Sequence, residues 1–228
     1  GEARWIETSI GCGEAATTLA PRTPLSPAPY AFALPGLRTI PASPEAGNPS
    51  INVIGGVVGV TGTNTATASS YNSVIGGGIS NTIGYESLFD SSFSPYSVIA
   101  GGHLNSTVAR ETVIGGGSRN QIIEGFLDDA SRTVIGGGEN NIADSSAAGV
   151  IAGGSNNVLK SSDAASIGGG SGNLVDEFSP GAAIAGGSAN VVGMYSDYAT
   201  IGGGSGNRLV RENDYGTIGG GTGNVISR

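Results

Sequence analysis

One short motif recurs nine times along this chain and constrains its fold more than any other feature. Each copy reads Ile-(Gly/Ala)-Gly-Gly-x-x-Asn, with no exception at the Ile, the last two Gly or the Asn. The isoleucines are Ile75, Ile99, Ile114, Ile135, Ile151, Ile167, Ile184, Ile201 and Ile218. The asparagines are Asn81, Asn105, Asn120, Asn141, Asn157, Asn173, Asn190, Asn207 and Asn224. A degenerate tenth copy begins at Ile54 but has no Asn six residues later.

The spacing of the motif selects the architecture. Successive isoleucines lie 24, 15, 21, 16, 16, 17, 17 and 17 residues apart, so the unit is about 16 residues with insertions. Helical repeats are longer and do not carry a glycine run in every unit. A short unit that is interrupted by glycine at a fixed place is typical of one coil of a solenoid. We therefore expect an all-β fold: a parallel β-solenoid (β-roll) of about ten short coils, preceded by an extended Pro-rich N-terminal arm.

Alternation within each unit predicts which side chains point inward. The residue two positions before the Ile is always small, and it shares a face with the Ile. Two positions after the Asn, seven of the nine copies have a large aliphatic residue: Ile83, Ile122, Leu159, Val175, Val192, Leu209 and Ile226. We expect two short strands per coil, enclosing a thin core of one Ile and one opposing aliphatic residue. The glycines would form the corner, where a positive φ is favourable only for Gly.

The nine asparagines are interpreted as a structural ladder. In stacked coils identical amides lie about 4.8 Å apart and can form hydrogen bonds along the stack. Asn also tolerates the left-handed backbone conformation of a turn. A ligand-binding role is disfavoured, because nine identical sites would be an unusual array.

The first 50 residues lack the motif. Residues 3–10 alternate as one strand, and eight of the ten prolines lie between positions 21 and 49. Such a Pro-rich stretch is extended and forms neither a helix nor a central strand. We divide the chain into an N-terminal strand segment (1–20), a Pro-rich arm (21–50) and the solenoid (51–228). The apolar residues of the arm, including Tyr30 and Phe32, are expected to dock on another surface.

Two sets of outward-facing residues are candidate interfaces. The residue just before the Ile is valine in five copies, at Val74, Val98, Val113, Val134 and Val150. An exposed apolar stripe of this kind is usually covered, either by the arm or by a neighbouring subunit. Tyr96, Tyr198 and Tyr215 each stand three residues before their Ile and would align on one edge. They cover the thin core locally, form an inter-subunit contact or bind a glycan.

Composition and residue counts exclude several function classes. The net charge of −8 argues against a nucleic-acid partner. One histidine, His103, and one cysteine, Cys12, leave little basis for His-based catalysis and none for an intrachain disulfide. Asn recurs where calcium-binding repeats require Asp, and no apolar run approaches the ~18 residues of a membrane span. We therefore expect no enzyme activity, no catalytic residue, no cofactor and no metal site.

A family resemblance adds to this interpretation. The segment Pro21-Arg22-Thr23-Pro24-Leu25-Ser26-Pro27-Ala28-Pro29-Tyr30-Ala31-Phe32-Ala33 resembles the PRxPLxxxPYAxxA linker of large secreted bacterial modular surface proteins. Repeats such as residues 199–207 resemble the TVGGGxxNTASG arrays of those proteins and, more loosely, the head repeats of trimeric autotransporter adhesins. The resemblance implies a left-handed parallel β-roll, an extracellular location at the cell surface and a role in a surface fibre.

Together these features predict a non-enzymatic, extracellular structural protein that assembles with copies of itself. We expect the segment that ends in Ile226 to stack head-to-tail on a neighbour's first coil, near residues 51–60, with the arm contacting that neighbour. The alternative is a trimeric adhesin or tail-fibre-like shaft that buries the valines at a three-fold axis and binds surface glycans or receptors through aromatic inserts. A third class, an enzyme acting on polysaccharides, would need a cleft with converging carboxylates.

Overall fold

The computed structural model describes residues 4–11, 16–25, 37–41, 51–55, 64–67, 70, 72–84, 94–124 and 130–227. The chain divides into two compact units, residues 1–34 and 35–228, which are described separately. In the first unit, β1 (Arg4–Gly11) pairs antiparallel with β2 (Ala16–Leu25). The strand expected over residues 3–10 is therefore one half of a hairpin, and its partner crosses the expected boundary at residue 20. Tyr30 and Phe32 lie outside the described residues.

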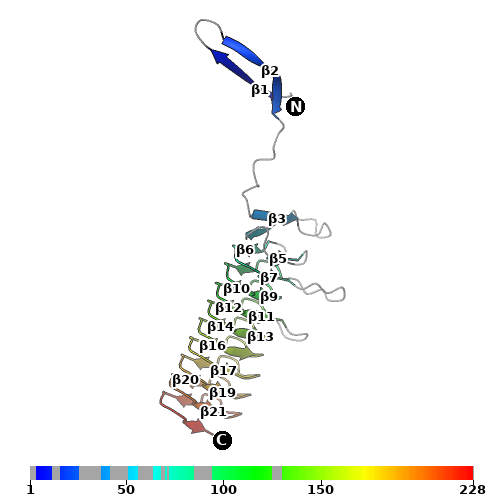
Figure 1. Cartoon of the computed structure of the whole chain (residues 1–228). Coiled ribbons are helices and arrows are strands. Elements are labelled where there is room, and N and C mark those ends of the chain that lie inside the picture. The colour runs from blue at the N-terminus through cyan, green and yellow to red at the C-terminus, as the bar shows by residue number, and fades with distance from the viewer. Residues whose placement is uncertain are drawn as a thin grey trace. The chain divides into compact units, whose positions relative to one another are not determined.

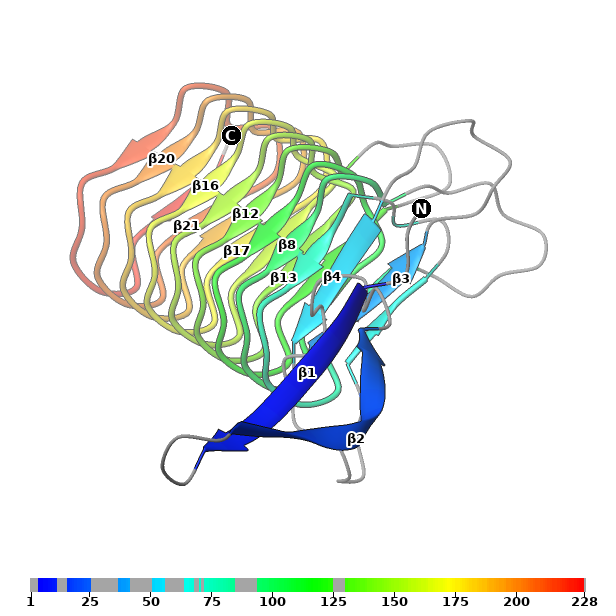
Figure 2. The same ribbon diagram turned by 90° about the horizontal axis from the view of Figure 1, so that it is seen from above.

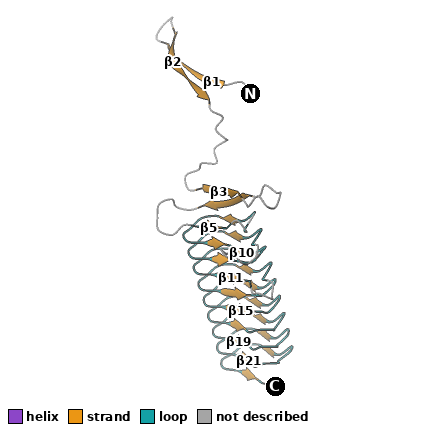
Figure 3. Cartoon of the chain, turned by 90° about the vertical axis from the view of Figure 1, so that its right-hand side faces the viewer, coloured by secondary structure: helices purple, strands orange, loops and turns teal. Residues whose placement is uncertain are grey.

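The second unit is a parallel β-solenoid with about nine turns in residues 65–226 (Figures 1 and 2), as the repeat predicts. Loops separate the short strands of every coil, and each coil adds one strand to each of two sheets (Figure 3). In the described residues the parallel strands of the first sheet are β4 (Ile51–Gly55), β6 (Val74–Ile75), β8 (Val98–Ile99), β10 (Val113–Ile114), β12 (Val134–Ile135), β14 (Val150–Ile151), β16 (Ser166–Ile167), β18 (Ala183–Ile184), β20 (Thr200–Ile201) and β22 (Thr217–Ile218).

The second sheet is built from the strands that follow each ladder asparagine. Its described strands are β5 (Thr65–Ala66), β7 (Thr82–Ile83), β9 (Ser106–Thr107), β11 (Gln121–Ile123), β13 (Ile142–Asp144), β15 (Val158–Lys160), β17 (Leu174–Val175), β19 (Val191–Val192), β21 (Arg208–Leu209) and β23 (Val225–Ile226). Equivalent residues of successive coils are paired in register in both sheets, for example Ile151 with Ile167 and Leu159 with Val175.

One strand from the Pro-rich segment joins the solenoid. Strand β3 (Leu37–Pro41) pairs antiparallel with β4, with Leu37 opposite Gly55 and Pro41 opposite Ile51. It is the edge strand of the first sheet. An edge position accommodates Pro41, because only one side of the strand pairs there and proline has no amide hydrogen to donate.

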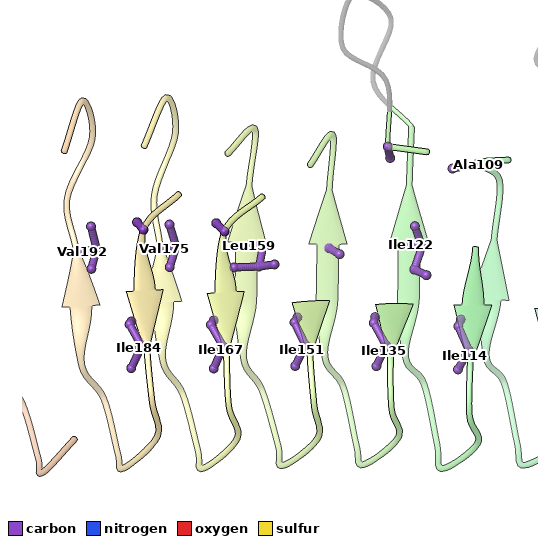
Figure 4. Close-up of a cluster of buried hydrophobic side chains, with 14 of the residues drawn as sticks. Ala109, Ile114, Ile122, Ile135, Ile151, Leu159, Ile167, Val175, Ile184 and Val192 are labelled. Atoms are coloured by element: carbon purple, nitrogen blue, oxygen red, sulfur yellow. The ribbon is translucent and has the colours of Figure 1, made fainter. Parts of the chain in front are cut away.

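The interior is a narrow double column of apolar side chains, as Figure 4 shows. All nine motif isoleucines are at most 5% exposed. Opposite them lie the aliphatic residues of the second sheet, such as Ile122, Leu159 and Val175, which are also buried. The inward faces predicted from alternation are therefore present in the structure.

The third glycine of the motif is required both by its own backbone and by the next coil. At Gly170, φ is +89°, and a Cβ would lie 2.0 Å from the carbonyl oxygen of Gly187. In the coil of Ile151 the middle glycine is less constrained: a Cβ at Gly153 would meet no atom closer than 4.0 Å, and its φ is not positive. Close stacking at the corner thus depends on the third position, where any side chain would collide with backbone.

Candidate functional site

The motif asparagines form a continuous hydrogen-bonded ladder inside the solenoid. The Oδ1 atom of each accepts the backbone amide of the next at 3.0–3.1 Å, from Asn81 through to Asn224. Asn157 is typical: its Nδ2 donates to Asn141 Oδ1, to the carbonyl oxygen of Gly153 and to that of Gly170. The rungs from Asn81 to Asn207 are completely buried, so their amides bind the coils to one another and face no ligand.

The ladder begins one rung earlier than the motif spacing indicates. Asn64 Oδ1 accepts both the backbone amide of Asn81, at 3.0 Å, and its Nδ2, at 3.1 Å. Asn64 stands ten residues after Ile54, whereas every motif asparagine stands six after its Ile. The coil that begins at Ile54 therefore does have a ladder asparagine, which the fixed spacing did not identify.

A second buried ladder was missed by the sequence analysis. Ser146, Ser162, Ser179 and Ser196 lie five residues before their Ile, and the Oγ of each accepts the backbone amide of its counterpart in the next coil at 3.0–3.1 Å. All four are completely buried. The signal was present in the sequence, because six of the nine residues at this position are serine and the others are Ala109, Ala130 and Asn213.

The valine column lies on an outer face that carries no charge. The five valines are paired in register on adjacent strands, and Val74, Val113 and Val150 are 37–40% exposed. In the four later coils the same position holds Ser166, Ala183, Thr200 and Thr217. The two positions after each Ile hold only Gly or Ala. We call these three positions of the nine coils the uncharged face.

A second aliphatic stripe lies on the opposite sheet and was not predicted. Ile142, Val158, Leu174 and Val191 are paired in register, point outward and are partly exposed. The stripe ends at Arg208, which lies in the coil after Val191, pairs with it and is exposed.

The corner before the first sheet gathers exposed aromatic residues in the later coils. Phe178 stacks on Tyr195 with ring centroids 5.2 Å apart, and Tyr198 stacks on Tyr215 at 5.5 Å. All four have φ between +55° and +56°, a strained region for bulky residues. Tyr198 fits because the equivalent residue of the preceding coil is glycine: a Cβ at Gly181 would lie 2.6 Å from Tyr198 Cδ1. Tyr198 and Tyr215 therefore meet as expected.

Other members of the predicted interface lie apart from this corner. Tyr96 occupies the same column as Tyr198 and is 55% exposed, but several coils separate the two rings. Ile226 lies on the second sheet in β23 and is 36% exposed. The structure thus divides the candidate residues between a flat sheet face, an aromatic corner and the last described strand.

A groove of about 400 Å³ borders the aromatic corner, and we call it the aromatic groove. It is lined by Ser145, Ser161, Asp163, Phe178, Pro180, Tyr195 and Asp197. On the far side of Tyr195, the guanidinium carbon of Arg211 lies 5.0 Å from the ring centroid. The groove therefore combines one aromatic wall with two carboxylates.

The described residues offer little basis for metal or acid–base chemistry. In the ranges that the structure describes, no three His, Cys, Asp or Glu side chains gather to hold a metal ion. His103 lies on an isolated bridge between Ile79 and Ser118 and is exposed. The described ion pairs, Arg119–Glu139, Lys160–Asp176 and Arg211–Glu212, are 3.4–3.7 Å long and solvent-accessible, so each contributes little to stability.

Comparison with known proteins identifies no relative: no protein-family model matches the chain, and no curated protein does. A search of the described residues for membrane-spanning helices finds none that is long and apolar enough. The functional interpretation therefore rests on the surfaces of the solenoid.

Proposed function

We propose that this chain is a non-enzymatic structural protein whose solenoid associates side by side with copies of itself. The observation that carries the proposal is the uncharged face, which extends over nine coils and includes the five in-register valines. The part of this face that carries the valines is a contiguous apolar surface, which is typical of an interaction site.

Electrostatics favours this face for contact between identical chains. Each copy carries a net charge of −8, so two copies repel least when they meet where charged side chains are absent. The columns of Gly and Ala beside the valines let the two backbones approach closely. Both copies also have the same coil spacing of about 4.8 Å, so valines of one chain can fit between those of the other in the five coils that carry them.

The location that we propose, outside the cell at its surface, rests on the resemblance of residues 21–33 to the linker of secreted modular proteins. Head-to-tail stacking with the arm on a neighbour stays a separate prediction. The two modes of assembly differ in what they require: side-by-side association requires the valines, whereas an end-on joint does not.

Charge substitution on the uncharged face tests the proposal. We expect the double variant Val113→Asp, Val134→Asp to be monomeric by light scattering, because burying two pairs of carboxylates between copies is unfavourable. Far-ultraviolet circular dichroism verifies that the solenoid still folds. Ser205→Asp, at an exposed position outside this face, is the matched control and should assemble like the unaltered chain.

Electron microscopy of the same samples separates the outcomes. Discrete particles or fibres that disappear in the double variant support side-by-side association. Fibres that persist in the double variant support head-to-tail stacking instead. An unaltered chain that is monomeric at all concentrations contradicts self-assembly in either mode.

A second candidate function is an adhesin-like shaft that binds glycans. It is favoured by the exposure of the stacked pair Tyr198 and Tyr215, which are 57% and 73% accessible. Aromatic rings that remain accessible on a rigid support suit the apolar faces of sugars. A glycan array probed with the unaltered chain and with Tyr198→Ala tests this: binding that Tyr198→Ala abolishes supports it, and no binding to any glycan contradicts it.

A further inference from the structure

The aromatic groove has one open aromatic wall. Along the column six residues before the Ile, the coils present Ser145, Ser161, Phe178 and Tyr195 in order. Tyr195 covers one face of the Phe178 ring, and Arg211 covers the far face of Tyr195. The other face of Phe178 is turned toward the coil of Ser161, whose small side chain leaves the groove beside it. This stack holds a cation at one end and borders open space at the other.

The aspartates of the groove belong to a hydrogen-bonded column that is interrupted once. Asp163 Oδ1 accepts the amide of Ala147 at 3.0 Å, and Asp214 Oδ1 accepts the amide of Asp197 at 3.1 Å. Each carboxylate thus bonds to the equivalent residue of the preceding coil. For Asp197 that residue is Pro180, which has no amide hydrogen. Among the described residues, no hydrogen bond or ion pair holds the Asp197 carboxylate.

The groove also lacks a compensating charge. No Lys or Arg is among its lining residues, and neither Asp163 nor Asp197 takes part in a described ion pair. An anion is repelled by two carboxylates on a chain of net charge −8. A neutral sugar would use the ring but gain nothing from the charges. A guanidinium or ammonium group complements both the aromatic ring and the carboxylates. Arg211 already makes the corresponding cation–ring contact with Tyr195.

We propose that the aromatic groove binds a guanidinium or ammonium cation, placed against the open face of Phe178 and attracted by the carboxylates of Asp163 and Asp197 that line the same groove. This function is independent of self-association, because the groove lies outside the uncharged face. The same chemistry is presented by basic side chains of a peptide and by free amines. A groove that extends over the coils from Ser145 to Tyr195 has room for more than one contact, so a peptide with several arginines should bind more tightly than a single cation.

Isothermal titration calorimetry of the full chain tests the proposal with four probes. These are arginine amide, spermidine, a peptide of three Arg-Gly-Ser repeats, and cellohexaose as a neutral saccharide. We expect the cations to bind, cellohexaose not to bind, and affinity to fall at least fivefold between 50 and 500 mM salt. Peptide binding at least tenfold tighter than arginine amide identifies a peptide as the source, whereas tighter binding of spermidine identifies a polyamine.

Three variants examine the parts of the site. Asp197→Asn and Phe178→Leu should each weaken arginine-peptide binding at least fivefold. Pro180→Ala is the sharper variant: it keeps both carboxylates and both rings but restores an amide donor for Asp197, and it should also weaken binding. Glu177→Gln, which removes an acid outside the groove, is the matched control for charge and should bind normally.

Circular dichroism confirms that each variant is folded. The proposal is overturned if none of the three cations binds the folded chain, if Asp197→Asn binds as tightly as the unaltered chain, or if cellohexaose binds in place of the cations. Because none of these substitutions touches the uncharged face, the oligomeric state of each variant reports separately on the proposed structural function.

Discussion

Asn64 and Asn81 lie in adjacent coils and are joined by two hydrogen bonds, from the backbone amide and from Nδ2 of Asn81 to Oδ1 of Asn64. The first asparagine follows its isoleucine by ten residues and the second by six. The connection between strand and ladder therefore varies in length without displacing the ladder. Each coil must place a side-chain amide in the ladder, but the number of residues between its Ile and that Asn can vary.

Removing one rung from the middle of the ladder should destabilise the solenoid strongly. Asn157→Ala removes five hydrogen bonds that link its coil to itself and to both neighbouring coils, and it leaves the carbonyl oxygen of Gly153 and the amide of Asn173 without their described partner. Each buried unsatisfied group costs about 1–3 kcal/mol, so we expect a loss of at least about 3 kcal/mol in the free energy of unfolding. Urea denaturation followed by circular dichroism measures it. Asn156→Gly, at the exposed neighbour with φ of +57°, should change stability by less than about 0.5 kcal/mol.

Gly170, a third glycine of the motif, and Gly153, a middle glycine, should differ sharply in their tolerance of a methyl group. Gly170→Ala places a Cβ 2.0 Å from a backbone oxygen at a positive φ, so we expect one of the largest losses of stability of any alanine substitution in the chain. At Gly153 the space is open, and Gly153→Ala should be neutral within about 1 kcal/mol, because it also restricts the unfolded chain. Thermal melting of the two variants compares them directly, and equal melting temperatures would contradict the stacking argument.

The isoleucine column should be sensitive to lost volume. Ile167 is completely buried against neighbours in both adjacent coils. Ile167→Ala should cost about 2–5 kcal/mol, whereas Ile167→Val, which removes one methyl group, should cost about 0.5–1.5 kcal/mol. Chemical denaturation of both variants gives the two values, and a cost for Ile167→Ala no larger than that for Ile167→Val would show that the core can collapse around the change.

The serine ladder should contribute measurably to stability, although it is shorter than the asparagine ladder. Ser179 Oγ accepts the amide of Ser196 and donates to the carbonyl oxygen of Gly193, each at 3.0 Å. Ser179→Ala leaves both groups unpaired inside the solenoid, for an expected loss of about 1–3 kcal/mol. Ser188→Ala, on an exposed bridge, is the matched control. Equal urea midpoints for the two variants would show that the ladder hydroxyls are dispensable.

Periodic positions could be predicted from the sequence, and singular ones could not. Ile135 and Asn141 recur with their counterparts at fixed offsets, so alternation correctly placed the isoleucine inside the coil, and the recurring amide correctly predicted the ladder. The serine ladder was overlooked although its position also recurs, because serine is common in turns and its burial is not implied by its chemistry. The free carboxylate of Asp197 was beyond sequence reasoning, since it depends on which residue of the preceding coil lies beside it.

The sequence by itself determined the architecture of this protein, because the same local requirements return in every coil: an apolar residue inward, a glycine at the corner and an amide in the ladder. Only the tertiary structure decided which side chains of different coils meet. Tyr195 lies 17 residues after Phe178 and 16 before Arg211 in the chain, yet its ring contacts both of them. The physical reason is that contacts in a solenoid run across coils of variable length, so neighbourhood is set by the stacking register and not by distance along the chain.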